Sequence, residues 1–277
     1  MKKIKKFGKD IFDIMGREEM KILPGNLAFY MILSIVPIIL SLLYVASWFG
    51  ISLTGLLKVF SGTVPDTVMK LLEPFFHTDL TLMSSISVIV GFVLVSNGAY
   101  SIIIGTNLMY NVHENNTLKR RIKSFFLAFI IIFVVLIMVV IMGIGNIILK
   151  ALVQIEIIKG LGLDVYGYYS ILKWPVAFLL LFVSLKTIYT IALDDKQPSK
   201  NMNKGALVST ILFLIVTAIF SWYTTELVDY SIFYGSLASF IVLLIWIYLL
   251  SYVVLLGIGI NSKKYFEDKK EKKEHNK

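Results

Sequence analysis

The chain has 277 residues, of which 57% are hydrophobic and only 16% are charged. A soluble domain of this size carries roughly a quarter charged residues, so the composition argues against a soluble globular protein. Cysteine is absent, which excludes disulfides and thiolate metal sites. The few charges are separated by long uncharged runs, which are the signature of helices that cross a membrane.

The first segment, residues 1–26, is polar and basic. Within it, apolar residues recur at helical spacing among lysines and acids: Ile4, Phe7, Ile11, Ile14 and Met15. This pattern predicts an amphipathic helix over residues 3–20 that lies along the inner membrane surface. No short apolar region with a small-residue cleavage site occurs here, so we expect no cleavable signal peptide.

Six apolar runs follow, and each is close to the roughly 20 residues that a helix needs to cross the hydrocarbon. They occupy residues 27–49, 82–108, 124–149, 169–193, 205–225 and 232–260. The fourth run contains Lys173 and Lys186, but residues 174–185 between them are uncharged. The runs do not alternate in polarity as the strands of a membrane barrel do.

The connecting segments complete the predicted organisation. Residues 51–79 are long for a plain connector and contain two short amphipathic pieces, which predict an external helical hairpin. Residues 263–277 form a basic tail without an apolar stripe, which we expect to be disordered. The predicted fold class is therefore all-α: a polytopic membrane helical bundle with six transmembrane helices in one membrane domain, residues 27–262.

The basic residues are distributed unequally between the two sides of this topology. Seven Lys and Arg precede the first span, four follow the second, three follow the fourth and seven follow the sixth. The opposite side carries four. The positive-inside rule then places both termini in the cytoplasm. The same rule accounts for the net charge of +9, so we expect no nucleic-acid partner. We expect membrane lipids as partners, with anionic head groups at the cytoplasmic face, and a homo-oligomer is compatible with the sequence.

The second span is the most polar of the six. Gly91, Gly98 and Gly105 recur every seven residues, which favours close helix packing. Asn97 and Ser101 lie four residues apart on a neighbouring face. An amide in hydrocarbon needs a polar partner, so Asn97 is expected to face protein or water. Hydrogen bonding between helices is the first interpretation of this pair, and contact with a substrate is the second.

Lys186 is the most unusual single residue of the predicted spans. It lies eight positions before Asp194 and hence about 12 Å inside the span. Tyr189 and Thr190 share its flank one turn further along. Two interpretations stay open: a cation that lines an internal cavity, or a lysine whose side chain extends to the interface. In the first span, Pro37 predicts a kink or hinge.

The sequence offers little for catalysis. His77, His113 and His275 are isolated, and no His or acid stands at metal-ligand spacing. No nucleophile or phosphate-binding motif occurs. We therefore predict no enzyme activity, no metal and no cofactor.

Several short motifs, in their order along residues 10–262, resemble the YihY/BrkB family of bacterial inner-membrane proteins. The motifs are Leu27-Ala28-Phe29-Tyr30 with Ser34 and Pro37, Lys204-Gly205-Ala206, Tyr234-Gly235-Ser236-Leu237, Trp246-Ile247-Tyr248, Gly257 and Asn261. The resemblance implies six spans in the cytoplasmic membrane. It adds Tyr30 and Ser34 to the substrate-path candidates, and Tyr234, Gly235 and Asn261 to the structural or hinge candidates.

The chain departs from the family pattern at two positions. Gly259 stands where the family usually has an acid, and Thr190 where it commonly has an arginine. If either residue carries binding or coupling in relatives, this protein works differently, and Lys186 is a candidate for the replacing cation. The older ribonuclease label of the family looks like a misassignment. Movement of lipids or other amphiphiles is the role suggested for relatives.

Residues and resemblance together favour a transporter or flippase-like protein for an anionic lipid or amphiphile. Two alternatives stay open: a non-transporting membrane scaffold for envelope assembly, and an ion-coupled small-solute transporter. The absence of carboxylates within the predicted spans disfavours proton coupling, because proton relays usually use Asp, Glu or His.

Overall fold

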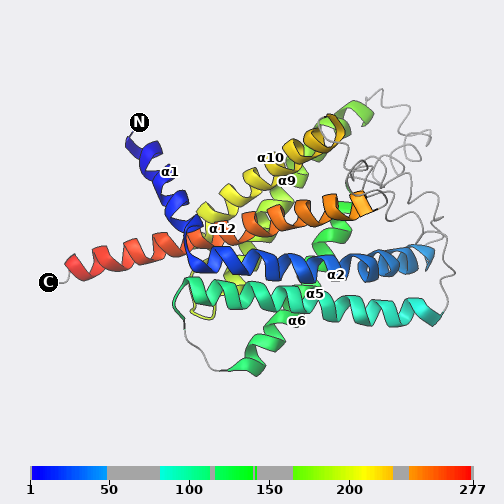
Figure 1. Cartoon of the computed structure of the whole chain (residues 1–277), viewed down its shortest axis with the longest axis horizontal. Coiled ribbons are helices and arrows are strands. Elements are labelled where there is room, and N and C mark those ends of the chain that lie inside the picture. The colour runs from blue at the N-terminus through cyan, green and yellow to red at the C-terminus, as the bar shows by residue number, and fades with distance from the viewer. Residues whose placement is uncertain are drawn as a thin grey trace.

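The computed structural model of the chain describes residues 2–48, 82–112, 116–139, 141, 165–226 and 237–275. Within these ranges the structure is helical and has no strand, so the all-α prediction is confirmed for them (Figure 1). The elements are α1 (Lys2–Met15), α2 (Glu18–Trp48), α5 (Leu82–Met109), α6 (Thr117–Val139), α9 (Val165–Ala192), the 3-10 helix η3 (Ser199–Met202), α10 (Asn203–Glu226) and α12 (Ala238–His275). The expected hairpin within residues 51–79 lies outside the described ranges.

Five stretches of the described helices are long and apolar enough to cross a membrane. They are Val88–Met109, Thr117–Met138, Ile171–Ala192, Ser199–Tyr223 and Phe240–Lys270. The chain is thus a helical protein with several membrane spans. The helix α2 is not among the five, so the count of six spans stays a prediction.

Helix α5 agrees closely with its predicted range, whereas α6 begins seven residues before the predicted start at 124. The basic run 119–123 therefore forms the first turns of α6 and is not a loop. Lysine and arginine have high helix propensity. Two members of the run also bind an acid on another element, as described below.

The helices form a bundle in which α2 runs along α5, and α12 packs against α2 and α10 (Figure 1). Helix α6 crosses α5 obliquely and also contacts α9. Small residues permit these contacts. A Cβ on Gly98 would lie 3.6 Å from the Cβ of Tyr30, and one on Gly105 would lie 3.1 Å from a methyl group of Leu23. Gly91 is buried as well.

The backbones of α10 and α12 come very close together where Gly205 faces Gly257. A Cβ on Gly205 would overlap the carbonyl oxygen of Gly257, so both helices require glycine here. Asn261 closes the junction: its Oδ1 accepts the Gly205 N–H at 2.7 Å, and its Nδ2 donates to the Met202 carbonyl at 3.2 Å. The side chain of Asn261 thus satisfies a backbone donor at the start of α10.

At the N-terminal end the predicted helix is present as α1, whereas the C-terminal end differs from its predicted structure. Helix α12 continues to His275, so the tail expected to be disordered is helical up to that residue. Contacts with α1 explain part of this order, because Lys263 lies 2.7 Å from Asp10 and 3.1 Å from Asp13. Ile14 of α1 is 1% exposed and fills the space beside Gly259.

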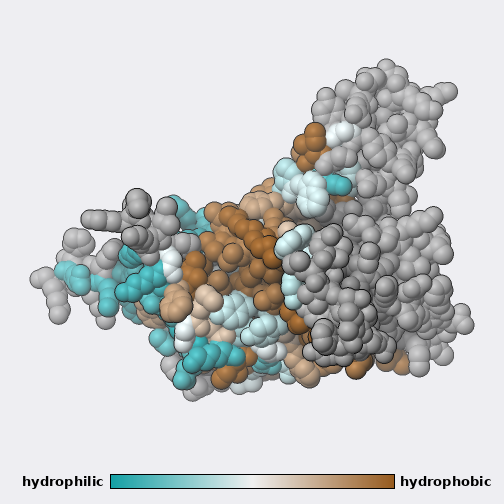
Figure 2. All heavy atoms as spheres, turned by 45° about the horizontal axis from the view of Figure 1, so that its top comes forward, coloured by the Kyte–Doolittle hydropathy of each residue, from teal (hydrophilic) through white to brown (hydrophobic). Residues whose placement is uncertain are grey.

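Both termini lie at the same end of the bundle, where α1 turns away and α12 extends beyond the other helices (Figure 1). We call this end, with the starts of α2 and α6 and the α9–α10 turn, the basic end. Figure 2 shows hydrophilic residues gathered there and a hydrophobic band across the middle of the described surface. Exposed large apolar side chains come from α6, α9 and α10, among them Phe129, Leu179 and Ile219. Such a continuous apolar surface is expected where lipid covers the helices.

Candidate functional site

A buried ion-pair cluster joins α6 to the α9–α10 turn at the basic end. The Asp194 carboxylate is 1% exposed, and its two oxygens lie 2.6 Å from Arg120 Nε and 2.6 Å from Lys123 Nζ. Burial alone would raise the pKa of Asp194. The hydrogen bonds and positive charges of Lys123 and Arg120 outweigh burial and hold this pKa below its ordinary value.

Asn107 ties α5 to the same cluster. Its Nδ2 donates to the carbonyl oxygens of Ile103 and Ala192 at 2.8 and 3.0 Å, and its Oδ1 accepts the Asp194 N–H at 2.9 Å. The amide thus satisfies the end of α9 and the first residue after it. As a result, α5, α6 and α9 are fixed to one another at one level of the bundle.

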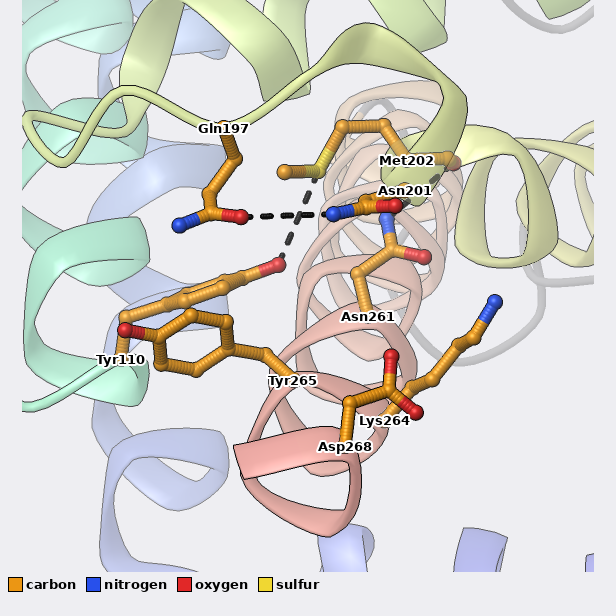
Figure 3. A pocket seen from close by; sticks show the side chains of 8 residues that line it. All are labelled: Tyr110, Gln197, Asn201, Met202, Asn261, Lys264, Tyr265 and Asp268. Atoms are coloured by element: carbon orange, nitrogen blue, oxygen red, sulfur yellow. Dashed lines mark hydrogen bonds between the residues drawn. The ribbon is translucent and has the colours of Figure 1, made fainter. Parts of the chain in front are cut away.

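Next to this cluster, side chains from the end of α5, the α9–α10 turn, η3 and α12 line a small cavity (Figure 3). The Tyr110 hydroxyl donates to the sulfur of Met202 at 3.6 Å, and the Tyr110 and Tyr265 rings lie 5.4 Å apart. The remaining cavity has a volume of ≈ 10 Å³, enough for about one water molecule. The basic end of the bundle is therefore closed at this point.

Arg121 lies apart from the ion-pair cluster, although it belongs to the same basic run. Its Nη1 donates to Asn97 Oδ1 of α5 at 2.8 Å. Its guanidinium carbon stands 4.8 Å from the ring centre of Phe125 and 5.9 Å from that of Tyr100. Arg121 is partly exposed, and within the described part of the chain no carboxylate pairs with it.

The contact lies well along α5 from the ion-pair cluster. Asn97 precedes Asn107 by ten residues of one helix, which places it about 15 Å further along α5. Asn107 binds Asp194, so Arg121 meets α5 at a different level of that helix from the cluster. Arg121 also belongs to Thr117–Met138, one of the stretches that are long and apolar enough to cross a membrane.

The structure unites only part of the predicted substrate path. Asn97 binds Arg121, and the Ser101 hydroxyl donates to the Asn97 carbonyl at 3.1 Å. Among the described residues, no hydrogen bond links this group to Lys186 or Tyr189. Asn97 was predicted to need a polar partner, and that partner is Arg121. The sequence places Arg121 in a cytoplasmic loop, whereas the structure places it in α6.

The other candidates on α9 have separate surroundings. Tyr189 is buried, and its hydroxyl donates to the Val254 carbonyl at 2.8 Å and lies 3.0 Å from Ser209 Oγ. Lys186 is partly buried, and no described acid forms an ion pair with it. Thr190 donates to the Lys186 carbonyl at 2.7 Å.

The candidates on α2 are part of helix packing. Tyr30 faces Gly98, and the buried Ser34 donates to the carbonyl oxygen of Met31 at 2.7 Å. The helix α2 continues through the position of Pro37. Tyr234 and Gly235 lie outside the described residues, and the described histidines and acids form no group that could hold a metal.

One signal in the sequence could have separated Arg121 from its neighbours. Arg120 and Lys123 are three residues apart and share a helix face, and Arg121 points away from that face. If the helix of the third span is extended toward the N-terminus to include residues 119–123, Arg121 falls on a different helix face from Arg120 and Lys123. The positive-inside interpretation treated all four cations alike.

Comparisons with known proteins place the chain in a family of membrane proteins. YfkH of Bacillus subtilis, which is named a ribonuclease-like protein, is 28% identical over 261 residues, covering 92% of this chain and 94% of its own. The UPF0761 membrane protein NTHI0384 of Haemophilus influenzae is 25% identical, covering 94% and 95%. No solved structure matches. Residues 11–277 match the family described as virulence factor BrkB, and the chain therefore belongs to the BrkB family.

Proposed function

We propose that the protein is a transporter or flippase-like protein for an anionic lipid or amphiphile. The observation that carries the proposal is Arg121, a partly exposed cation within the candidate span Thr117–Met138 that is held by Asn97 of α5. A charge in this position is costly unless it is paired, and charges inside membranes mark the paths of substrates and ions. With no described carboxylate beside it, Arg121 suits an anionic group that arrives with the substrate.

The proposal includes a topology of six spans in the bacterial cytoplasmic membrane. Helix α2 supplies the remaining span, since its 31 residues reach about 46 Å and it packs along α5. The basic end then faces the cytoplasm with both termini, as the positive-inside rule requires. Single cysteines at Lys200 and Lys272, in a chain without cysteine, would react with an impermeant maleimide only in inside-out vesicles under this topology.

Transport is tested in proteoliposomes that contain fluorescent phosphatidylglycerol or phosphatidylcholine. Dithionite bleaching from outside measures how much labelled lipid crosses the bilayer. We expect protein-dependent movement of phosphatidylglycerol that is lost in Arg121→Gln and kept in Lys200→Gln. The control removes one exposed cation of the basic end, so it matches the change in charge.

A negative result is informative if the protein is shown to be folded. Wild-type vesicles without movement of either lipid would contradict autonomous lipid transport and would favour the scaffold alternative. If phosphatidylglycerol moves equally fast with Arg121→Gln and with the wild type, the protein transports lipid but Arg121 does not bind it during transport.

A further inference from the structure

We infer that Arg121 binds the phosphate of a membrane lipid, and that this lipid arrives sideways from the bilayer at the α5–α6 surface. The inference rests on the proposed function for the negative charge of the ligand. It adds the chemical group that is bound and the route by which that group reaches the site.

The donor pattern of the guanidinium points to an oxyanion with two accessible oxygens. Arginine has five N–H donors, and Asn97 accepts from Nη1. Within the described residues, Nε and Nη2 of Arg121 have no hydrogen-bonding partner, and these two atoms form one edge of the guanidinium. Two parallel N–H groups on one edge match two oxygens of a phosphate or of a carboxylate, and phosphate is the anionic group that membrane phospholipids carry. Lysine would keep the charge but could not form this pair.

The other side of the guanidinium is held in place. Phe125 stacks 4.8 Å from it, and Phe92 stacks on Phe125 with ring centres 5.9 Å apart. Cation–π contact and the bond to Asn97 fix the orientation of the free edge before any ligand binds. A preorganised donor pair loses less conformational entropy on binding than a mobile side chain does.

The small space left beside Asn107 argues for a lateral route. Asn107 and Asp194 tie α5, α6 and α9 together at the basic end, and the cavity next to them holds about one water. Two larger grooves, of ≈ 420 and ≈ 460 Å³, are both lined by Asn111 and Phe266 at the basic end, and the second is also lined by Asp194. Neither groove is lined by Arg121 or Asn97.

The surface around Arg121 suits the acyl chains of such a lipid. Ile122, Phe126 and Phe129 of α6 are 62%, 58% and 64% exposed. They follow Arg121 along α6. A lipid whose phosphate meets the free edge of Arg121 can therefore lay its chains over an apolar helix face.

Binding can be measured separately from transport. Purified protein in detergent is titrated with phosphatidylglycerol, and native mass spectrometry reports the lipid that remains bound. We expect Arg121→Lys to weaken binding about tenfold or more, because the paired charged hydrogen bonds are lost. Arg17→Lys is the matched control, since Arg17 is a partly exposed arginine of the basic end. Asn97→Ala, which keeps the charge but frees the guanidinium, is a second variant expected to weaken binding.

Two competitors test the group and the route. Oleate, which carries a carboxylate, should displace phosphatidylglycerol poorly, and millimolar glycerol 1-phosphate, which is confined to water, should not displace it. Equal binding by wild type, Arg121→Lys and Asn97→Ala would overturn the site. Displacement by oleate at equal concentration would overturn the phosphate assignment, and displacement by glycerol phosphate would overturn the lateral route. Specific binding without transport would contradict only the proposed function.

Discussion

Replacing Gly205 by alanine tests whether the α10–α12 junction holds the bundle together. The added Cβ would overlap the Gly257 carbonyl oxygen and would meet the Asn261 side chain. The Gly257 carbonyl oxygen is a backbone atom, so it cannot rotate away from the added Cβ as a side chain could. The two helices must therefore separate by about 1 Å, since a carbon and an oxygen in contact stand roughly 3.2 Å apart.

The cost follows from what that separation breaks. Asn261 would lose its bonds to Gly205 and Met202, now 2.7 and 3.2 Å long. A buried hydrogen bond left unmade costs about 1–3 kcal/mol, and overpacking a core costs a further 1–3 kcal/mol. For two lost bonds and the overpacking, we expect Gly205→Ala to lose about 3–9 kcal/mol of stability, a large share of the roughly 5–15 kcal/mol of a typical protein.

Gly98→Ala is the matched control, because its Cβ would meet Tyr30 at an ordinary 3.6 Å. Both variants would be heated in the same detergent, and the fraction that stays monodisperse would be followed by size-exclusion chromatography. The reasoning requires a clearly lower midpoint for Gly205→Ala and almost no change for Gly98→Ala. Equal midpoints for the two variants would refute it.

Two further predictions concern the basic end. Asp194→Asn should destabilise the protein by about 3 kcal/mol at neutral pH, because two cations lose their shared acceptor. Since the native pKa of Asp194 is lowered, this stabilisation is complete well above 3.8 and is lost as the pH falls below that value. Melting curves of wild type and variant should therefore converge in acid, and a constant difference would contradict the ion-pair explanation. Gly259→Ala should loosen α1, because its Cβ would displace a methyl group of Ile14, and faster hydrogen exchange in α1 would report this. In the Ile14→Ala background the same substitution should add almost nothing, and an additive effect would show that the two residues do not interact.

Hydropathy predicted the long helices well because a membrane span depends on length and apolarity alone. The range of α5 was predicted almost to the residue. The tail and the start of α6 were harder, since lysine-rich segments resemble disordered chain or loops in composition. Their helices depend on partners distant in sequence: Asp194 lies 74 residues from Arg120, and Asp10 belongs to the opposite end of the chain from Lys263.

The candidate site was predicted only in part for the same reason. Asn97 could be recognised because an amide in an apolar run needs a partner. The identity of that partner depends on how α6 crosses α5, which periodicity does not encode. Tyr189 illustrates the opposite case: a tyrosine one turn from a lysine of an apolar run resembles a substrate contact, yet its hydroxyl donates to the Val254 carbonyl of α12.

The contact between α1 and α12 also sets an order of events during synthesis. Asp13 and Lys263 are 250 residues apart, so the first helix leaves the ribosome long before its partner exists. At about 5–20 residues per second, the delay is roughly 10–50 s. For that time Ile14 lacks the surface around Gly259 against which it packs in the finished fold. The ion pairs of Lys263 with Asp10 and Asp13 can therefore form only after α12 has been made.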